Sequence, residues 1–317
     1  AFGYFSCCKH ASLARKVVSS AQATRFGYTI RMSKHFFQAA NEKLIAMSVL
    51  CVFSAALTGC VTQARTMSSL PCAAEIHANV TTAVTKLTAQ AAADPSNNDT
   101  QLCLAYAFIA QKKFPAAIEA TSRVLAVDKV NPLALRMRAF ARYRLGVYQM
   151  AIDDASASLK FETSGEAYEI MGKCRLHMGD SAGAAEDFRI WANLDKSIEA
   201  RCWMGSAQWT GGDQAGALKT WETAEIVAPK DPEPFIWKAG FLFRADDKSG
   251  ALEAAKRAVE LAPDSPQALG TLARVQSWSG DAKGAAETVA RLAKTNPKAA
   301  AKLTEKLKTS VPAVKGA

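Results

Sequence analysis

The sequence predicts an all-α protein built as a solenoid of stacked helical hairpins, and three observations lead to this prediction. The composition is 49% hydrophobic but only 8% aromatic, with abundant alanine. Such a mixture favours helices that pack closely through small side chains over a sheet rich in β-branched and aromatic residues. An alanine also returns at a nearly constant interval along the chain, and each of these alanines follows a turn signal.

The repeating unit shows the expected order of helix, turn and helix. The recurring alanines are 33 or 34 residues apart: Ala117, Ala151, Ala184, Ala217, Ala251 and Ala285. A small residue lies twelve positions before each one: Ala105, Ala139, Gly172, Gly205, Ala239 and Ala273. Because two helices approach closely only where both carry small side chains, each unit is predicted to be an antiparallel helix pair. Turn residues such as Gly179-Asp180 suit a helix end followed by an N-cap, and Pro229, Pro263 and Pro297 end the second helices.

This pattern resembles the tetratricopeptide repeat (TPR). The resemblance covers residues 98–297 and implies a right-handed α-solenoid of about six TPR helix-turn-helix repeats with helical caps. Trp191 and Leu292 depart from it, because alanine is usual at their positions. We expect an N-terminal helix within residues 73–97, a capping helix over residues 298–309 and a disordered tail over residues 310–317.

The segment before the repeats has the features of a bacterial lipoprotein. Residues 32–59 form a basic region followed by an apolar stretch, as in a signal peptide. This stretch ends in Leu57-Thr58-Gly59-Cys60, which resembles a lipobox. The resemblance implies that the Cys60 thiol accepts a diacylglyceryl group and that the mature chain begins there, with residues 60–72 as a lipidated tether. Val61 stands where an aspartate would favour the inner membrane, so we expect an outer-membrane anchor facing the periplasm.

Residues 1–31 do not fit this organisation. They lack an initiating methionine and any acidic residue, and we interpret them as the product of an upstream start assignment outside the native chain. Their composition also suits a mitochondrial transit peptide. The alternative is therefore an organellar TPR protein in which residues 44–58 remain as an uncleaved anchor. A helper of polysaccharide synthesis or export is a further alternative.

Net charge argues against a nucleic-acid partner. The whole chain carries +10, but residues 1–59 hold 7 Lys and Arg against 1 acidic residue, and residues 60–317 hold 32 against 28. No basic cluster of the kind that binds phosphate backbones dominates the repeats.

The TPR resemblance implies that the first helix of each repeat lines a concave groove that holds a protein or peptide partner. The fifth, ninth and twelfth positions of these helices supply the candidate partner-binding residues: Tyr106, Arg136, Phe140, Tyr143, Lys173, Trp209, Phe243 and Arg274. Aromatic residues and arginine are frequent anchors of interfaces. Each aromatic could instead pack between helices, as we expect for Trp203, Trp221 and Trp237. The overall pattern resembles assembly lipoproteins of type IV and tight-adherence pili.

No motif in the sequence indicates an enzyme, a metal site or a cofactor. HExxH, GxSxG, Walker A and GxGxxG patterns are missing, and we predict a protein without a catalytic residue or a small-molecule substrate. Cys103, Cys174 and Cys202 are expected to be ordinary buried thiols, since a repeat core of this size needs no disulfides.

Overall fold

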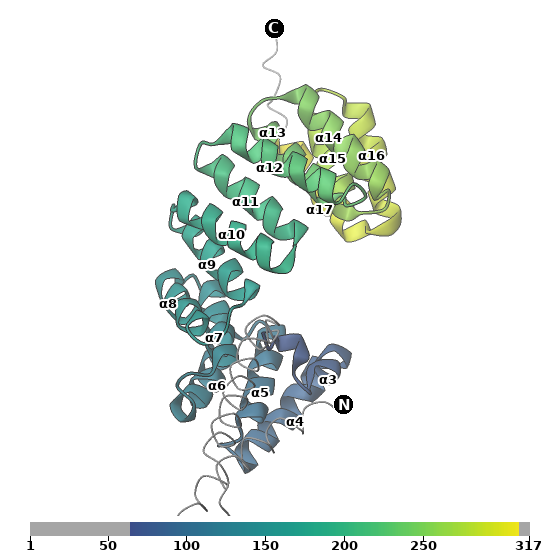
Figure 1. The fold of residues 1–317 in the computed structure, drawn as a ribbon. Helices are drawn as coiled ribbons and strands as arrows, with labels where there is room; N and C mark the ends of the chain where they lie inside the picture. The colour runs from purple at the N-terminus through teal and green to yellow at the C-terminus, as the bar shows by residue number, and fades with distance from the viewer. Residues whose placement is uncertain (1–63, 311–317) are drawn as a thin grey trace, which may run out of the picture. The chain divides into compact units, whose positions relative to one another are not determined.

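A computed structural model of the protein describes residues 64–310 (Figure 1). These residues form helices and no strands. The predicted signal peptide, the lipidation site at Cys60, the upstream segment 1–31 and the tail beyond Ser310 lie outside the described residues. Among the helices that are described, none has the length and apolar character needed to cross a membrane.

Twelve of the helices form the six predicted pairs, which confirms the all-α solenoid. The pairs are α5 (Asn98–Ala110) with α6 (Phe114–Val127), α7 (Pro132–Arg144) with α8 (Tyr148–Leu159), α9 (Gly165–His177) with α10 (Ser181–Asp195), α11 (Ile198–Thr210) with α12 (Gln214–Val227), α13 (Glu233–Arg244) with α14 (Lys248–Leu261), and α15 (Pro266–Trp278) with α16 (Ala282–Thr295). They follow one another along the stack in chain order (Figure 1). Helix α17 (Pro297–Ser310) packs on the last pair, at the place predicted for the capping helix.

Local signals in the sequence explain the turn inside each repeat. In the third repeat, Gly179 has a φ of 84°, and the following Asp180 caps α10 by accepting a hydrogen bond from the Gly183 amide at 2.8 Å. The fourth repeat uses Gly212 and Asp213 in the same way. A left-handed residue ends the first helix, and an aspartate N-cap starts the second one, so the chain reverses within a few residues.

Packing between the two helices of a repeat depends on the small residues predicted from the period. Gly172 lies against Phe188, and a Cβ added to Gly172 would be 2.6 Å from the Phe188 ring. A Cβ on Gly205 would be 2.5 Å from Nε1 of Trp221. The two rings are fully buried, so glycine stands opposite an aromatic ring where even a methyl group would collide.

The N-terminal region differs from the prediction in two respects. The expected single helix is broken at Asn79 into α3 (Ala73–Ala78) and α4 (Val80–Ala93), because Asn79 has an extended backbone and its side chain caps α4. The predicted tether is also too long. The chain is packed from Arg65 onward, includes the short 3-10 helix η2 (Met67–Ser69), and buries Leu70 to 3% exposure.

The expectation for the cysteines is wrong at one position. Cys103 forms a disulfide with Cys72, across 5.9 Å between the Cα atoms. The sequence does not indicate this pair, because the two cysteines are 31 positions apart and Cys72 precedes the first predicted helix. Cys174 and Cys202 are buried free thiols, as predicted. Burial raises the pKa of the Cys174 thiol to about 12.

Candidate functional site: the first-helix surface

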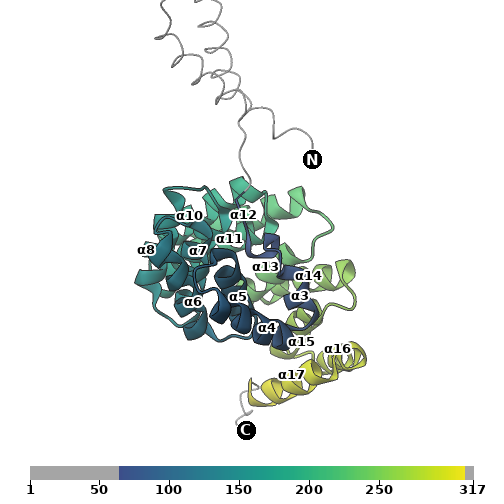
Figure 2. The ribbon, with the colours of Figure 1, turned by 90° about the horizontal axis from the view of Figure 1, so that it is seen from below.

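The first helices of successive repeats line one side of the stack. Direct contacts join α5 with α7, α7 with α9, α11 with α13, and α13 with α15. Figure 2 shows α7, α11 and α13 toward the centre of the view, with α8, α10 and α12 outside them. We call the side formed by α5, α7, α9, α11, α13 and α15 the first-helix surface. All eight predicted partner-binding residues belong to these helices.

The N-terminal part of the first-helix surface is covered by the chain itself. The backbone amide of Arg65 donates to Oε1 of Glu162 at 3.0 Å, and the Arg136 guanidinium donates to the Arg65 carbonyl. The Arg65 side chain forms an ion pair with Asp99 at 2.9 Å. These contacts fix the start of the described chain across the first three repeats.

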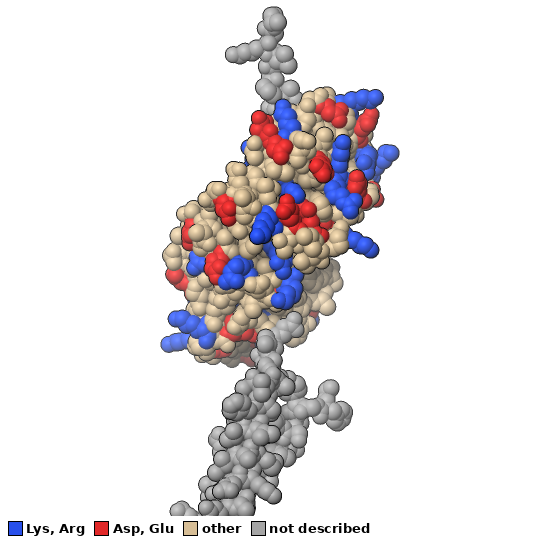
Figure 3. All heavy atoms as spheres, turned by 45° about the horizontal axis from the view of Figure 1, so that its top comes forward, with Lys and Arg blue, Asp and Glu red and all other residues tan. Residues whose placement is uncertain are grey.

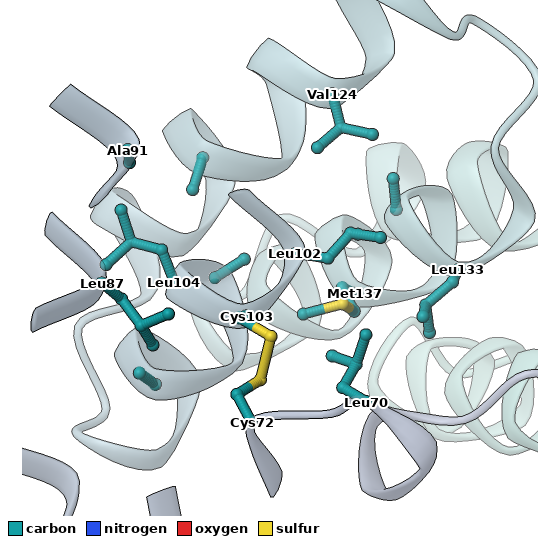
Figure 4. Packing of buried hydrophobic residues seen from close by; sticks show 14 of the residues in the cluster. Leu70, Cys72, Leu87, Ala91, Leu102, Cys103, Leu104, Val124, Leu133 and Met137 are labelled. Atoms are coloured by element: carbon teal, nitrogen blue, oxygen red, sulfur yellow. A yellow bond between two sulfur atoms is a disulfide. The ribbon is translucent and has the colours of Figure 1, made fainter. Parts of the chain in front are cut away.

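Apolar contacts and a covalent bond continue this cover. Leu70 joins the same buried cluster as Leu133 and Met137 (Figure 4). The Cys72–Cys103 disulfide then attaches the segment to α5, as Figure 4 shows. We call residues 65–78 the N-terminal cover. A partner in the groove would have to displace it from repeats one and two.

Arg136 therefore requires a correction as a predicted partner contact. Its side chain is only 2% exposed and pairs with Glu162 at 2.7 Å and with Glu166 at 3.4 Å. Burial raises the pKa of Glu166, and the charge of Arg136 opposes this shift. The guanidinium fixes the N-terminal cover in place and is closed to a partner in this conformation.

Tyr106 also contacts the N-terminal cover. Its hydroxyl lies 3.1 Å from Nε2 of His77, and the two rings meet edge to face. Tyr106 stays half-buried, so its role as a partner contact remains a prediction that depends on the position of the cover.

The middle of the first-helix surface holds three further candidates in packed surroundings. Phe140 and Tyr143 are half-buried, with ring centroids 6.5 Å apart. Lys173 pairs with Glu169 at 2.5 Å, and its ammonium group lies 4.8 Å from the centre of the Trp203 ring. Each of these side chains already has partners within the chain, which reduces what it could offer to a ligand. Their roles as partner contacts remain predictions.

The tryptophans mainly pack between repeats. Trp221 is fully buried, and the rings of Trp203 and Trp237 meet edge to face at 4.9 Å, in agreement with the prediction for these three residues. Trp209, a predicted partner contact, is half-buried and lies 5.9 Å from Trp221 and 5.7 Å from Phe241, measured between ring centroids.

The C-terminal part of the first-helix surface is open. A groove of about 590 Å³ is lined by residues of α13, α15 and α17, among them Ile236, Gly270, Arg274 and Lys302. Phe243 lies nearby on α13, its ring 4.7 Å from that of Trp278. Of the predicted residues, Arg274 is the one that lines this groove.

Two features of this groove were missed by sequence reasoning. Lys302 belongs to α17, which was interpreted only as a cap. Gly240 and Gly270 are not among the predicted partner-binding residues. The sequence does contain a signal for these two glycines. Each lies in the middle of a predicted helix, where glycine is unfavourable, and neither occupies the small-residue position of its repeat, which is Ala239 or Ala273.

Among residues 64–310, no group of three or more His, Cys, Asp or Glu side chains could hold a metal ion. The open groove is lined by apolar residues such as Ile236 and Leu303, by the polar Thr271, and by the cations Arg274 and Lys302.

The tetratricopeptide-repeat family model matches residues 242–307, from the end of α13 to α17. A TPR protein from Parabacteroides merdae is similar in structure, with a TM-score of 0.59 and 16% sequence identity over 73% of this chain and 93% of that one. PilW, described as a widely conserved type IV pilus biogenesis factor, has a TM-score of 0.54 and 19% identity over 68% of this chain and 98% of its own. A TPR-containing protein from Cytophaga hutchinsonii has a TM-score of 0.51 and 14% identity over 71% of this chain and 94% of that one. The family-model match over residues 242–307 and the six helix pairs give residues 64–310 the tetratricopeptide-repeat solenoid fold, which these solved structures share.

Proposed function

We propose that the protein is a lipid-anchored TPR scaffold, and not an enzyme, that holds a protein or peptide partner in its groove while an envelope complex such as a pilus assembles. The anchor is the diacylglyceryl group predicted on Cys60, and the compartment is the periplasmic face of the outer membrane. The partner site is the open C-terminal part of the first-helix surface.

The observation that carries the proposal is the open space beside Gly240 and Gly270. Both glycines lie inside helices, where glycine destabilises by about 1 kcal/mol relative to alanine. A Cβ at either position would meet nothing within 4 Å. Packing within the chain therefore does not explain these glycines, in contrast to Gly172 and Gly205. A ligand that approaches the helix backbone closely would explain them.

Similarity to PilW supports the assembly role at the level of architecture. The two chains share the fold, and nearly the whole of PilW is covered. Helical repeat proteins use such elongated surfaces for binding other proteins. Fold alone does not determine function, so the assembly role depends on identifying the partner.

Photocrosslinking tests the partner site. A benzoylphenylalanine at position 270 places the reactive group in the open groove, and one at position 240 places it in the open space on α13, one helical turn after Ile236 of the groove. The exposed Lys219 and Lys283 on second helices serve as matched control positions. We expect a defined crosslinked protein from the groove positions and none from the controls. Equal crosslinking from all four positions, or none from any, would contradict the groove as the partner site.

The membrane anchor is tested separately. Replacing Cys60 with serine should leave the helical circular-dichroism spectrum unchanged and move the protein from the membrane to the soluble fraction, and intact mass should show acyl chains on Cys60 only in the wild type. Membrane association that persists in Cys60→Ser would favour an uncleaved anchor.

A further inference from the structure

We propose that the groove between α13, α15 and α17 binds an acidic peptide segment that carries an apolar side chain. This inference rests on the proposed function, because it specifies the kind of partner for the same groove. It depends on three features of the described residues: two cations without a carboxylate partner, apolar residues in the lining of the groove, and the mixed charge of the surface elsewhere.

Arg274 and Lys302 are two of the cations that line this groove. Within the described part of the chain, Arg274 forms hydrogen bonds only with the Gly270 carbonyl and the Thr271 hydroxyl of its own helix, each at 3.3 Å. No carboxylate of residues 64–310 forms an ion pair with Arg274 or with Lys302.

Three arginines on two earlier first helices, in contrast, form ion pairs with carboxylates of the chain. Arg138 and Arg142 on α7 both pair with Asp154, at 2.7 Å and 2.6 Å. Arg175 on α9 pairs with Asp187. These three arginines of the second and third repeats therefore have carboxylate partners within the chain, whereas Arg274 at the C-terminal groove has none among residues 64–310. Carboxylates of a partner would complete the charge pairing there.

The apolar residues that line the groove suit an apolar side chain of a partner. Ile236 and the buried Leu292 and Leu303 line the groove from three different helices. Gly270 also lines the groove, and the space where its Cβ would lie is empty. An aliphatic residue between the acidic groups of a partner would bury apolar surface here while its neighbours reach Arg274 and Lys302.

A peptide fits these features better than a nucleic acid or an anionic membrane does. Nucleic acids and membranes require extended, single-sign surfaces of several Lys and Arg residues. Figure 3 shows Lys and Arg interspersed with Asp and Glu on the face it presents. The groove instead combines the cations Arg274 and Lys302 with the apolar side chains of Ile236, Leu292 and Leu303, a mixture that suits a peptide with both acidic and apolar residues.

A random dodecapeptide display library, selected on the purified protein, provides the test. We expect the selected peptides to be enriched in Asp and Glu around one aliphatic residue. Labelled copies should bind roughly tenfold or more weakly, by fluorescence anisotropy, to the double variant Arg274→Glu/Lys302→Glu, because attraction is replaced by repulsion. The milder Arg274→Gln/Lys302→Gln should lose less. The matched control Lys219→Glu/Lys283→Glu changes the net charge equally on exposed second-helix positions and should bind as the wild type does.

Selection of neutral or basic peptides, selection of no peptide, or equal loss of binding in the control variant would overturn the acidic-peptide inference. Binding to phosphatidylglycerol vesicles that is lost in Arg274→Glu/Lys302→Glu, with no selected peptide, would overturn it in favour of a lipid headgroup. The crosslinking result at positions 240 and 270 is independent of these outcomes, so a partner of different chemistry would still be detected. Helical circular dichroism of each variant establishes that the fold is retained.

Discussion

Glycine to alanine substitutions should separate the glycines that the packing requires from those that the open groove permits. Gly172 and Gly205 face buried rings, whereas Gly240 and Gly270 face open space. All four lie in first helices of the repeats. The same chemical change is therefore made in the same kind of helix with opposite surroundings.

Magnitudes follow from two terms. Alanine favours the helix by about 1 kcal/mol at each of the four positions, since it reduces the conformational freedom of the unfolded chain. At Gly172 and Gly205 the new methyl group would lie 2.6 Å from Phe188 and 2.5 Å from Trp221, and such overpacking costs about 1–3 kcal/mol. The helix term is common to all four variants and cancels when they are compared. The two classes should therefore differ in free energy of unfolding by about 1–3 kcal/mol.

Urea denaturation followed by circular dichroism at 222 nm measures this difference. We expect the midpoint to rise for Gly240→Ala and Gly270→Ala, and to lie below theirs for Gly172→Ala and Gly205→Ala. Repeat proteins can unfold in more than one step, so each variant is compared with the wild type over the whole transition. Midpoints that rise equally in all four variants would refute the close approach of helix and ring inside the repeats.

Two further predictions concern the disulfide and one buried carboxylate. Replacing Cys72 with serine should lower the free energy of unfolding by about 2–4 kcal/mol, because the Cys72–Cys103 bond closes a loop between residues 31 positions apart; dithiothreitol should lower the urea midpoint of the wild type and leave that of Cys72→Ser unchanged, and equal sensitivity would contradict the bond. Burial raises the pKa of Asp187 to about 6 despite the opposing charge of Arg175. Since the folded state then binds this proton more readily than the unfolded state, stability from this group should rise by roughly 1–3 kcal/mol as the pH falls from 7 toward 4. Asp187→Asn should remove that rise in urea titrations at several pH values, and an unchanged pH dependence would exclude Asp187 as its source.

The repeats could be predicted from the sequence because the signals for them are local. The left-handed turn residue and the alanine of the second helix lie within about ten residues of one another in every repeat, and an aspartate N-cap lies between them in the last four repeats. Gly179 and Asp180 are enough to place the end of α9 and the start of α10. Such signals need no knowledge of distant contacts.

The occupied and open parts of the first-helix surface could not be predicted, because they depend on contacts between distant residues. The bond from the Arg65 amide to Glu162 spans 97 positions of sequence. Arg136 therefore had the features of a groove contact until its partners became known. Lys302 was missed for the opposite reason: the helix that carries it was expected to close the stack, and it also forms a wall of the groove.

The packed N-terminal cover changes what a lipid on Cys60 would do. Five residues of chain lead from Cys60 to Arg65, and a fully extended chain of that length spans at most about 18 Å. Arg65 is bonded across the first three repeats, and the disulfide holds the segment that follows it. A lipid on Cys60 would thus hold the N-terminal end of the stack close to the membrane surface.

The open groove lies at the other end of the stack, beside α17 (Figure 1). If Cys60 carries the proposed lipid and the groove binds the proposed partner, the intervening repeats would determine how far that partner can be from the anchoring point. Insertion of one additional repeat between the third and fourth would lengthen this separation without altering either end. A scaffold that works at a fixed distance should lose assembly activity on such an insertion while it keeps peptide binding, whereas a protein that only captures its partner should tolerate the insertion.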